Sequence, residues 1–230
     1  LMAAHRSISA YGSRTQAIDA AVTRLEAVLE AAVASHRRAS LGVCGGRTAA
    51  ALLPVLAQRA LDWSLIDVFL VDERWVPVDS DDSNEKLVRN SLLHGSAAAA
   101  RFFGLKSAHA QAITALDEVE QRLGQIATPF DAVFLGMGDD GHVASLFPAG
   151  AENQECNRLV VASTAPVPPY ERISLSPGAL GQARHVVIPV MGAAKRAVLD
   201  RALRAGPVDE FPVRHVLASD TLCCEIFAAP

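Results

Sequence analysis

The sequence predicts an α/β fold with a largely parallel sheet. Short apolar runs alternate along the chain with stretches in which apolar residues recur every three or four positions. Strands that alternate with helices in this way are typical of parallel sheets. The 230 residues contain no internal repeat, no low-complexity tract and no obvious linker, so we expect a single domain over residues 1–230.

In the first half of the chain, helices and strands are predicted from periodicity and from end signals. Ser13 and Gln16 have the spacing of a capping box, ahead of a helix with the apolar residues Ile18, Val22, Leu25, Leu29 and Val33. Residues 41–44 predict a strand, and Thr48 can cap a helix over 49–60, in which Pro54 predicts a kink. Residues 66–71 predict a buried strand. Asp82 or Ser83 can cap the next helix.

The second half continues this alternation. Residues 93–106 are expected to be irregular, and the spacing of Ile113, Leu116, Leu123 and Ile126 predicts another helix. Five more strands are predicted, over 131–137, 159–162, 172–175, 186–190 and 222–227. The fourth of these precedes a helix that is expected to stop at Gly206.

Composition and charge exclude several classes of protein. Half of the residues are apolar and a fifth are charged, which is typical of a globular chain rather than a disordered one. The formal net charge of −4 argues against a general nucleic-acid binder. No apolar run approaches the ~18 residues of a membrane span, and the N-terminus has no apolar core of a secretory signal. We therefore expect a cytoplasmic protein without nucleic-acid or membrane partners.

The four cysteines do not have the spacing of a disulfide framework or a zinc site. Cys44 and Cys156 are isolated in the sequence, and Cys223 and Cys224 are adjacent and would face opposite sides of a strand. No C-x-x-C pair or Cys/His zinc spacing occurs. Free buried thiols in a reducing compartment are the expectation.

Polar or glycine-rich residues follow four of the predicted strands. Ligands of open α/β sheets bind outside the carboxyl ends of the strands. Because parallel strands end at the same edge of a sheet, we expect these four segments to converge on one site. They are residues 45–48, residues 72–75, residues 138–142, and Gly192 with Lys195.

The first segment has the features of an anion site. Gly45 and Gly46 let the backbone approach an anion, and the helix that follows offers free N–H groups. Arg47 and Thr48 add side-chain donors. The alternative is a tight turn without a ligand.

Two further cations, Lys195 and Arg74, are also candidates for binding an anion. Lys195 lies in the first turn of a predicted helix, where the helix dipole disfavours a positive charge, so an anion beside it would explain its position. Arg74 can clamp an anion. A solvated lysine and an ion-paired arginine are the alternatives.

His142 is the candidate general base. It lies on a glycine-rich turn, and an imidazole suits acid–base chemistry near neutral pH. Asp139 or Asp140 can orient one ring nitrogen. A structural histidine is the alternative. The glycines at 136, 138 and 141 match a dinucleotide fingerprint, but acids stand where a pyrophosphate needs bare backbone donors. The residues predict a pocket for an anionic small molecule, with one general base and no metal cluster.

Two long motifs resemble those of the 6-phosphogluconolactonase family. Residues 71–77, with Ser83 and Asn84, resemble one family signature, and residues 130–148 resemble the other. The Gly45-Gly46 turn, residues 172–175 and Lys195 follow in the order of the family. The resemblance covers the chain from about Ser13 to Phe227.

This resemblance implies a doubly wound, mostly parallel sheet with helices on both faces, shared with glucosamine-6-phosphate deaminases and ribose-5-phosphate isomerases. It implies hydrolysis of 6-phosphogluconolactone in the oxidative pentose phosphate pathway, with no metal or organic cofactor. The small-molecule partner is a phosphorylated sugar lactone, and we expect a monomer or a small homo-oligomer. His142 matches the catalytic histidine and Asp72 an acid of the sugar pocket, and we expect both to be catalytic residues. Carried over as substrate- or phosphate-binding residues are Gly45, Gly46, Arg47, Thr48, Arg74, Arg172 and Lys195.

The chain departs from the family pattern at a few positions. Cys44, Arg47 and Ala49 stand where the glycine loop usually has two serines and a proline, and Val143 replaces a usual threonine. Two alternative functions remain open. One is a sugar-phosphate isomerase or amino-sugar phosphate deaminase of the same fold, with Asp72 as the base. The other is a non-catalytic sugar-phosphate sensor.

Overall fold

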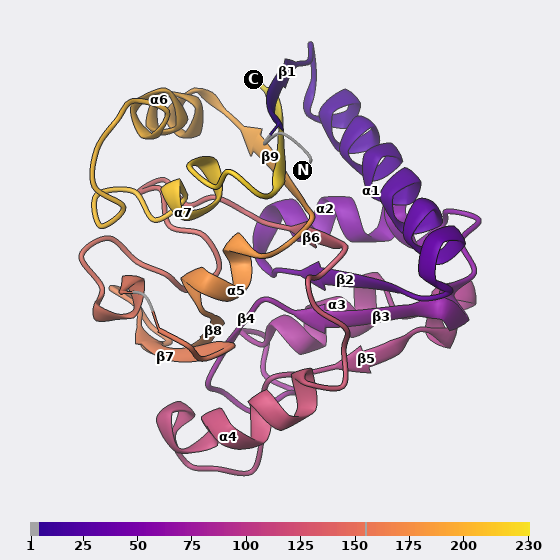
Figure 1. The fold of residues 1–230 in the computed structure, drawn as a ribbon, viewed down its shortest axis with the longest axis horizontal. Helices are drawn as coiled ribbons and strands as arrows, with labels where there is room; N and C mark the ends of the chain where they lie inside the picture. The colour runs from indigo at the N-terminus through magenta and orange to yellow at the C-terminus, as the bar shows by residue number, and fades with distance from the viewer. Residues whose placement is uncertain (1–4, 155) are drawn as a thin grey trace.

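The computed structural model describes residues 5–154 and 156–230, and its largest element is a seven-stranded sheet (Figure 1). The strand order is β1-β10-β9-β6-β2-β3-β5, and every neighbouring pair is parallel. This confirms the predicted fold class. The strands are β1 (His5–Ala10), β2 (Ala39–Val43), β3 (Ile66–Leu70), β5 (Arg101–Phe103), β6 (Ala132–Phe134), β9 (His185–Met191) and β10 (Cys223–Ala229).

The sheet is doubly wound, and its direction of growth reverses between β2 and β6. From β2 the chain adds β3 and β5 on one side, and from β6 it adds β9 and β10 on the other. A crevice forms at the carboxyl ends of the strands wherever such a reversal occurs. The segments that begin at Cys44 and Leu135 leave the sheet at this point.

A second, three-stranded sheet lies beyond the carboxyl ends of β2 and β3, to the left in Figure 1. It consists of β4 (Asp72–Arg74), β8 (Glu171–Leu175) and β7 (Val160–Thr164), all antiparallel. The predicted strands at 159–162 and 172–175 are therefore present, but outside the main sheet. Residues 72–74 form a strand of this sheet rather than a loop, and Arg74 lies directly opposite Arg172.

The helices fill the connections between strands. They are α1 (Arg14–His36), α2 (Gly46–Ala57), α3 (Asn84–Ser91), α4 (Ala112–Leu123), α5 (Pro177–Gly181), α6 (Ala193–Ala202) and α7 (Arg214–Leu217), with 3₁₀ turns η1 (Trp63–Leu65), η2 (Gly95–Ala99) and η3 (Ala151–Asn153). As predicted, Ser13 caps α1 and Ser83 caps α3, through bonds from Gln16 N and Lys86 N. None of the described helices is long and apolar enough to cross a membrane.

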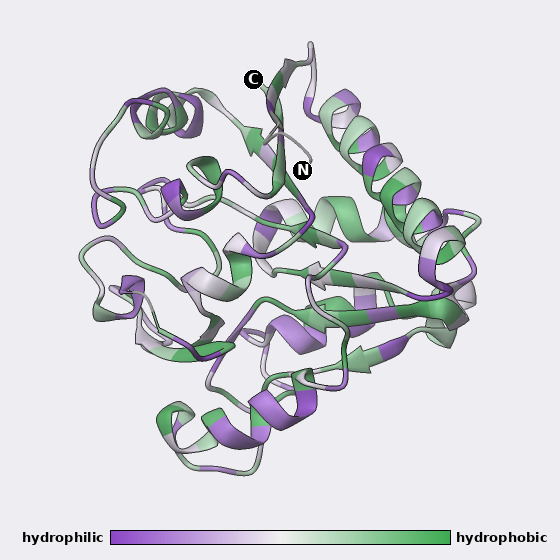
Figure 2. Cartoon of the chain, viewed as in Figure 1, coloured by the Kyte–Doolittle hydropathy of each residue, from purple (hydrophilic) through white to green (hydrophobic). Residues whose placement is uncertain are grey.

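Burial explains the hydropathy pattern in Figure 2. Every residue of β2 and β3 is buried, as in central parallel strands covered on both faces. The helix α1 packs against β9, β10 and β2, and its green and purple residues alternate along the ribbon as its faces turn toward the sheet and the solvent.

The expectation of a single domain stays a prediction.

Some elements differ from their predictions. The edge strands β1 and β5 and the short helices α5 and α7 were not expected. Thr48 does not cap α2, because the helix already begins at Gly46 and its N-cap is Gly45. The helix continues through Pro54, which has no N–H, so the carbonyl of Ala50 lacks its usual donor within the helix.

Candidate active site

The four segments expected to converge do line one cavity of about 930 Å³, at the reversal point of the sheet. All nine residues expected to form the site lie on its wall: Gly45, Gly46, Arg47, Thr48, Asp72, Arg74, His142, Arg172 and Lys195. They come from the segments that follow β2, β6 and β9, including the first turns of α2 and α6, and from the small sheet. The predicted convergence is therefore confirmed, whereas the role of each residue stays a prediction.

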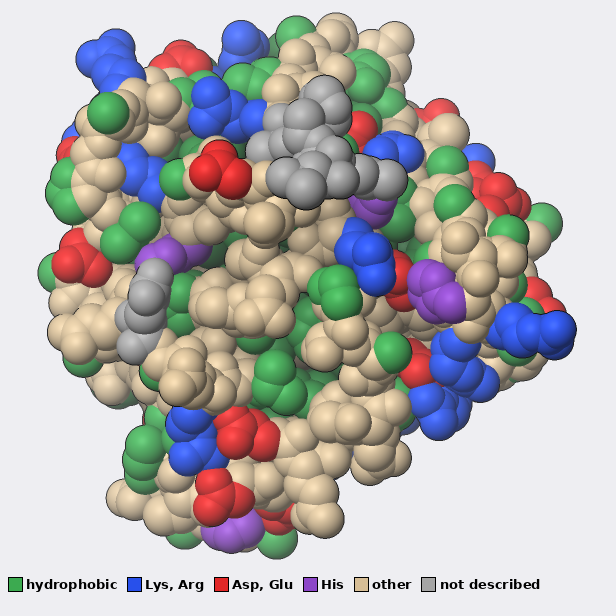
Figure 3. Space-filling model, viewed as in Figure 1, with side chains coloured by type: hydrophobic (Ala, Val, Ile, Leu, Met, Phe, Trp, Pro, Cys, Tyr) green, Lys and Arg blue, Asp and Glu red, His purple; other side chains and the backbone are tan. Residues whose placement is uncertain are grey.

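The four cations that were predicted for this site have no acidic partner. Among the residues that the structure describes, Arg47, Arg74, Arg172 and Lys195 form no ion pair. Elsewhere in the protein ion pairs between arginine and acid are common, and acidic and basic side chains are interspersed on the face in Figure 3. Unpaired cations that share a concave wall attract an anion.

Backbone carbonyls hold three of these cations in place. Lys195 Nζ donates to Met137 O at 2.5 Å, a guanidinium nitrogen of Arg74 to Asp82 O at 2.5 Å, and Arg172 Nε to Pro169 O at 2.8 Å. A carbonyl oxygen orients a cation without neutralising it. The charges therefore remain available to a ligand.

The pair of Arg172 and Arg74 is the strongest sign of an anion site. The two residues are cross-strand partners, and Arg172 is buried. Burial lowers the pKa of the Arg172 guanidinium, and the positive charge of Arg74 lowers it further. The nearby carboxylates, with Asp72 first among them, oppose this fall without reversing it. Like charges directly opposite each other destabilise a sheet. A bound anion would relieve this repulsion.

His142 is oriented by a neighbouring carboxylate. Its Nδ1 lies 2.6 Å from Asp140 Oδ1, and its backbone N–H donates to the same oxygen at 3.1 Å. Burial raises the pKa of Asp140, but the hydrogen bonds and the charge interaction with His142 together outweigh it, and the net pKa is lowered. With Nδ1 as the donor, Nε2 is left to accept a proton. Of the two acids considered from the sequence, Asp140 therefore takes this position.

Gly138 leaves room for that hydrogen bond. A Cβ at this position would lie 2.1 Å from His142 Nδ1 and 2.5 Å from Asp140 Oδ1. Gly138→Ala should therefore displace the imidazole, and a misplacement of about 1 Å can reduce turnover by about 10²-fold. Steady-state kinetics would measure the loss of kcat.

A matched glycine provides the control for this prediction. A Cβ at Gly136, which also lines the cavity, would meet only Cys44 Sγ, at an ordinary 3.6 Å. We expect Gly136→Ala to keep most of the activity. Equal kcat values for the two variants would show that the space around the imidazole is not what Gly138 protects.

The two glycines that precede α2 are needed for different reasons. Gly45 is needed because its backbone lies close to the side chain of Asn84, and a Cβ at this position would lie 1.8 Å from Asn84 Oδ1. Gly46 has open space around it but a φ of 89°, which L side chains rarely adopt. Together they bring the start of α2, with Arg47 and Thr48, to the cavity wall.

Asp72 is held by two hydrogen bonds. Its Oδ2 accepts from Ser145 Oγ at 2.7 Å, and its Oδ1 accepts from Asn84 Nδ2 at 3.2 Å. The residue is only 5% exposed but lines the cavity. Such a fixed acceptor suits a substrate hydroxyl.

Cys44 lines the same cavity as a neutral thiol. Burial raises its pKa to about 12, and the negative charge of Asp72 adds to the rise. Its Sγ accepts a hydrogen bond from Gly136 N at 3.1 Å. A thiol with this pKa is a poor nucleophile. The expectation of a free buried thiol is confirmed here and for Cys224, but Cys156 is exposed and Cys223 half-buried.

Comparison with known families matches almost the whole chain. Residues 12–224 match the model of the glucosamine-6-phosphate isomerases/6-phosphogluconolactonase family. The chain belongs to this family. A 6-phosphogluconolactonase of Pseudomonas aeruginosa is 37% identical over 215 residues, which cover 91% of this chain and 90% of that protein. One of Pseudomonas putida is 41% identical over 196 residues, covering 82% and 80%.

Solved structures of family members have the same fold. A crystal structure of a 6-phosphogluconolactonase from Shewanella baltica superimposes with a TM-score of 0.95 at 34% identity, covering 98% of both chains. A monomeric glucosamine-6-phosphate deaminase superimposes with a TM-score of 0.79 at 14% identity, covering 96% of both chains, and this likeness concerns the fold alone.

Several residues of this family member's site were not predicted. Arg14 at the start of α1 and Phe147, whose ring centroid lies 5.0 Å from that of His142, also line the cavity. Arg14 gave no signal in the sequence, because it looks like any exposed residue in the first turn of a helix. Asn84 and Ser145 lie within the family motifs, but only the structure shows that both hold Asp72.

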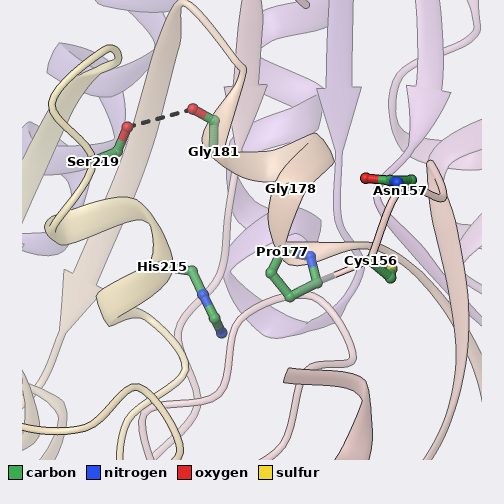
Figure 4. Close-up of a pocket in the computed structure, with 7 residues that line it drawn as sticks. All are labelled: Cys156, Asn157, Pro177, Gly178, Gly181, His215 and Ser219. Carbon is green, nitrogen blue, oxygen red and sulfur yellow. Dashed lines mark hydrogen bonds between the residues drawn. The ribbon is translucent and has the colours of Figure 1, made fainter. Parts of the chain in front are cut away.

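A second cavity, of about 510 Å³, lies beside α5 and α7 (Figure 4). Cys156, Pro177, His215 and Ser219 are on its wall. None of the nine predicted site residues is among the described residues that line it. The chemistry expected from the family therefore belongs to the larger cavity.

Proposed function

We propose that this chain hydrolyses 6-phosphogluconolactone to 6-phosphogluconate, with His142 as the general base. The observation that carries the proposal is one cavity that combines the four predicted cations, which have no acidic partners, with an imidazole oriented by Asp140. The names of the similar proteins support the substrate. The cations suit a phosphate, and the imidazole suits activation of water.

The proposed reaction begins with water. His142 Nε2 accepts a proton from the water as its oxygen attacks the lactone carbonyl carbon. Hydrogen-bond donors, either backbone N–H groups or Arg74, stabilise the oxyanion that develops. The bond between this carbon and the ring oxygen then breaks. The imidazolium returns its proton to the departing ring oxygen, which yields the open-chain acid.

The cations bind the part of the substrate that does not react. Arg74 and Lys195 hold the phosphate, and Arg47, Thr48 and Arg172 border the same cavity. Binding energy at the phosphate positions the ester carbonyl against His142. Asp72 accepts from a sugar hydroxyl.

A coupled assay tests the function. Glucose-6-phosphate dehydrogenase would supply fresh lactone, and release of acid would be followed with and without this protein. We expect acceleration well above spontaneous hydrolysis, and no acceleration would refute the proposal. Ammonia released from glucosamine 6-phosphate would favour a deaminase with Asp72 as its base. Binding without turnover would favour a sensor.

Lys195 provides a test of the phosphate site. Lys195→Ala should raise KM by about 10- to 100-fold and change kcat much less, because a charge-assisted hydrogen bond to a bound phosphate is lost. Hydrolysis of the unphosphorylated gluconolactone should not change. Lys86→Ala is the matched control, since Lys86 lies outside the cavity and pairs with Asp81. An unchanged KM for Lys195→Ala would remove this lysine from the phosphate site.

Other expectations stay predictions. These are a cytoplasmic location, a monomer or a small homo-oligomer, and the lack of a nucleic-acid partner.

A further inference from the structure

A cluster of metal-ligating side chains lies at the opposite end of the main sheet from the active site. His185 is the first residue of β9 and Cys223 the first residue of β10, and the two are register partners in these parallel strands. Glu225 lies two residues further along β10, on the same face as Cys223. One ligand atom from each residue, an imidazole nitrogen, a sulfur and a carboxylate oxygen, lies within 4.8 Å of the other two.

Arg24 of α1 reaches all three of these groups. Its Nε pairs with Glu225 Oε2, its Nη2 lies 3.3 Å from His185 Nδ1, and its positive charge acts on the Cys223 thiol. A guanidinium has no acceptor, so His185 Nδ1 is the unprotonated ring nitrogen. The three groups therefore already direct their lone pairs at one positive charge.

We propose that His185, Cys223 and Glu225 form a Zn²⁺ site in which the metal ion displaces the Arg24 guanidinium. Nitrogen, sulfur and carboxylate oxygen are the ligand types that zinc prefers, and water would complete the tetrahedral coordination. The strands hold the backbone of the ligands in place, because β9 pairs with β6 and β10, and β10 also pairs with β1.

The surroundings give the ion a route of entry. The side chains of Arg24 and Glu225 are 32% and 19% exposed, so the arginine can swing into solvent and the carboxylate can be reached. The positive charges of Arg24 and Arg184 act on His185 and oppose an incoming cation, whereas the negative charges of Glu225 and Asp131 favour it. As the bond between zinc and sulfur forms, the Cys223 thiol releases its proton to solvent.

Direct titration of the full chain with Zn²⁺ and Co²⁺ tests the site. We expect one ion per chain by calorimetry, and a thiolate-to-cobalt charge-transfer band in the absorption spectrum. Cys223→Ser should abolish the band and weaken zinc binding at least tenfold, since even the loss of an outer hydrogen-bond partner costs about 10–100-fold. His185→Gln should weaken binding as well. Cys156→Ser, which changes an exposed thiol elsewhere, should leave both readouts unchanged.

Arg24 provides a second test, because removal of its positive charge should increase the affinity for zinc. Arg24→Gln removes the competing cation and should tighten zinc binding. Failure of both the wild-type chain and Arg24→Gln to bind zinc would overturn the site, as would an unchanged cobalt band in Cys223→Ser.

Zinc should act on stability rather than on lactone hydrolysis. At a zinc concentration 100 times its Kd, the ratio of folded to unfolded protein should rise about 100-fold, provided that zinc binds the folded state alone. This rise should be absent in Cys223→Ser. An equal rise in wild type and Cys223→Ser would place the bound zinc elsewhere. The outcome does not depend on the proposed lactonase activity.

Discussion

Replacing His142 with alanine should reduce kcat by about 10²- to 10⁴-fold, the range that general acid–base catalysis typically contributes. Without the imidazole, no group is left at this position to take a proton from water. KM should change much less, because the cations that hold the phosphate remain. The rate should be measured with freshly generated lactone, and spontaneous hydrolysis should be subtracted.

Two further variants make this result specific. His142→Gln keeps a polar side chain but no base, so it should lose as much activity as the alanine variant. His94→Ala is the control, because His94 is exposed and does not line the cavity. Thermal unfolding of each variant would show that the fold is retained. Turnover by His142→Ala close to that of wild type would remove this residue from the mechanism.

The main sheet could be predicted from the sequence because its central strands are short, mostly apolar segments bounded by glycine or polar residues. The edge strands β1 and β5 lack this signature, since Ile8 and Arg101 face solvent at the margin of the sheet. The small sheet was also missed as a unit. Its three strands come from distant parts of the chain, and their pairing is a tertiary contact that no local pattern encodes.

The candidate site was predictable for a geometric reason: parallel strands all end at one edge, so residues just after them must meet. Contacts within the site were not predictable. Nothing in the sequence distinguishes Asp140 from Asp139, and the hydrogen bond to His142 depends on the turn conformation. The residues of the motif around Glu73 also have two different structural roles that the sequence does not separate. Asp72 and Arg74 line the cavity, whereas Glu73 is fully buried.

Glu73→Ala should lower the free energy of unfolding by about 3–5 kcal/mol. The carboxylate of Glu73 accepts from three backbone N–H groups, those of Arg74, Asn84 and Glu85, at 2.7–2.8 Å. Two of these open α3, so Glu73 satisfies the start of that helix from outside. Burial raises the pKa of Glu73, and these backbone hydrogen bonds oppose the rise. Each buried donor left without an acceptor costs about 1–3 kcal/mol.

The same substitution should also weaken substrate binding in the active site, through its effect on α3. Asn84, the first residue of that helix, holds Asp72, so loosening the helix should also raise KM. Urea unfolding would measure the stability, with Glu30→Ala as the control at an exposed position of α1, where a change within about 0.5 kcal/mol is expected. Glu73→Gln retains one carbonyl acceptor and should lose less stability than the alanine variant. A Glu73→Ala protein within about 1 kcal/mol of wild type would contradict this role, because it would leave three buried donors, Asn84 N, Glu85 N and Ser83 Oγ, without their acceptor.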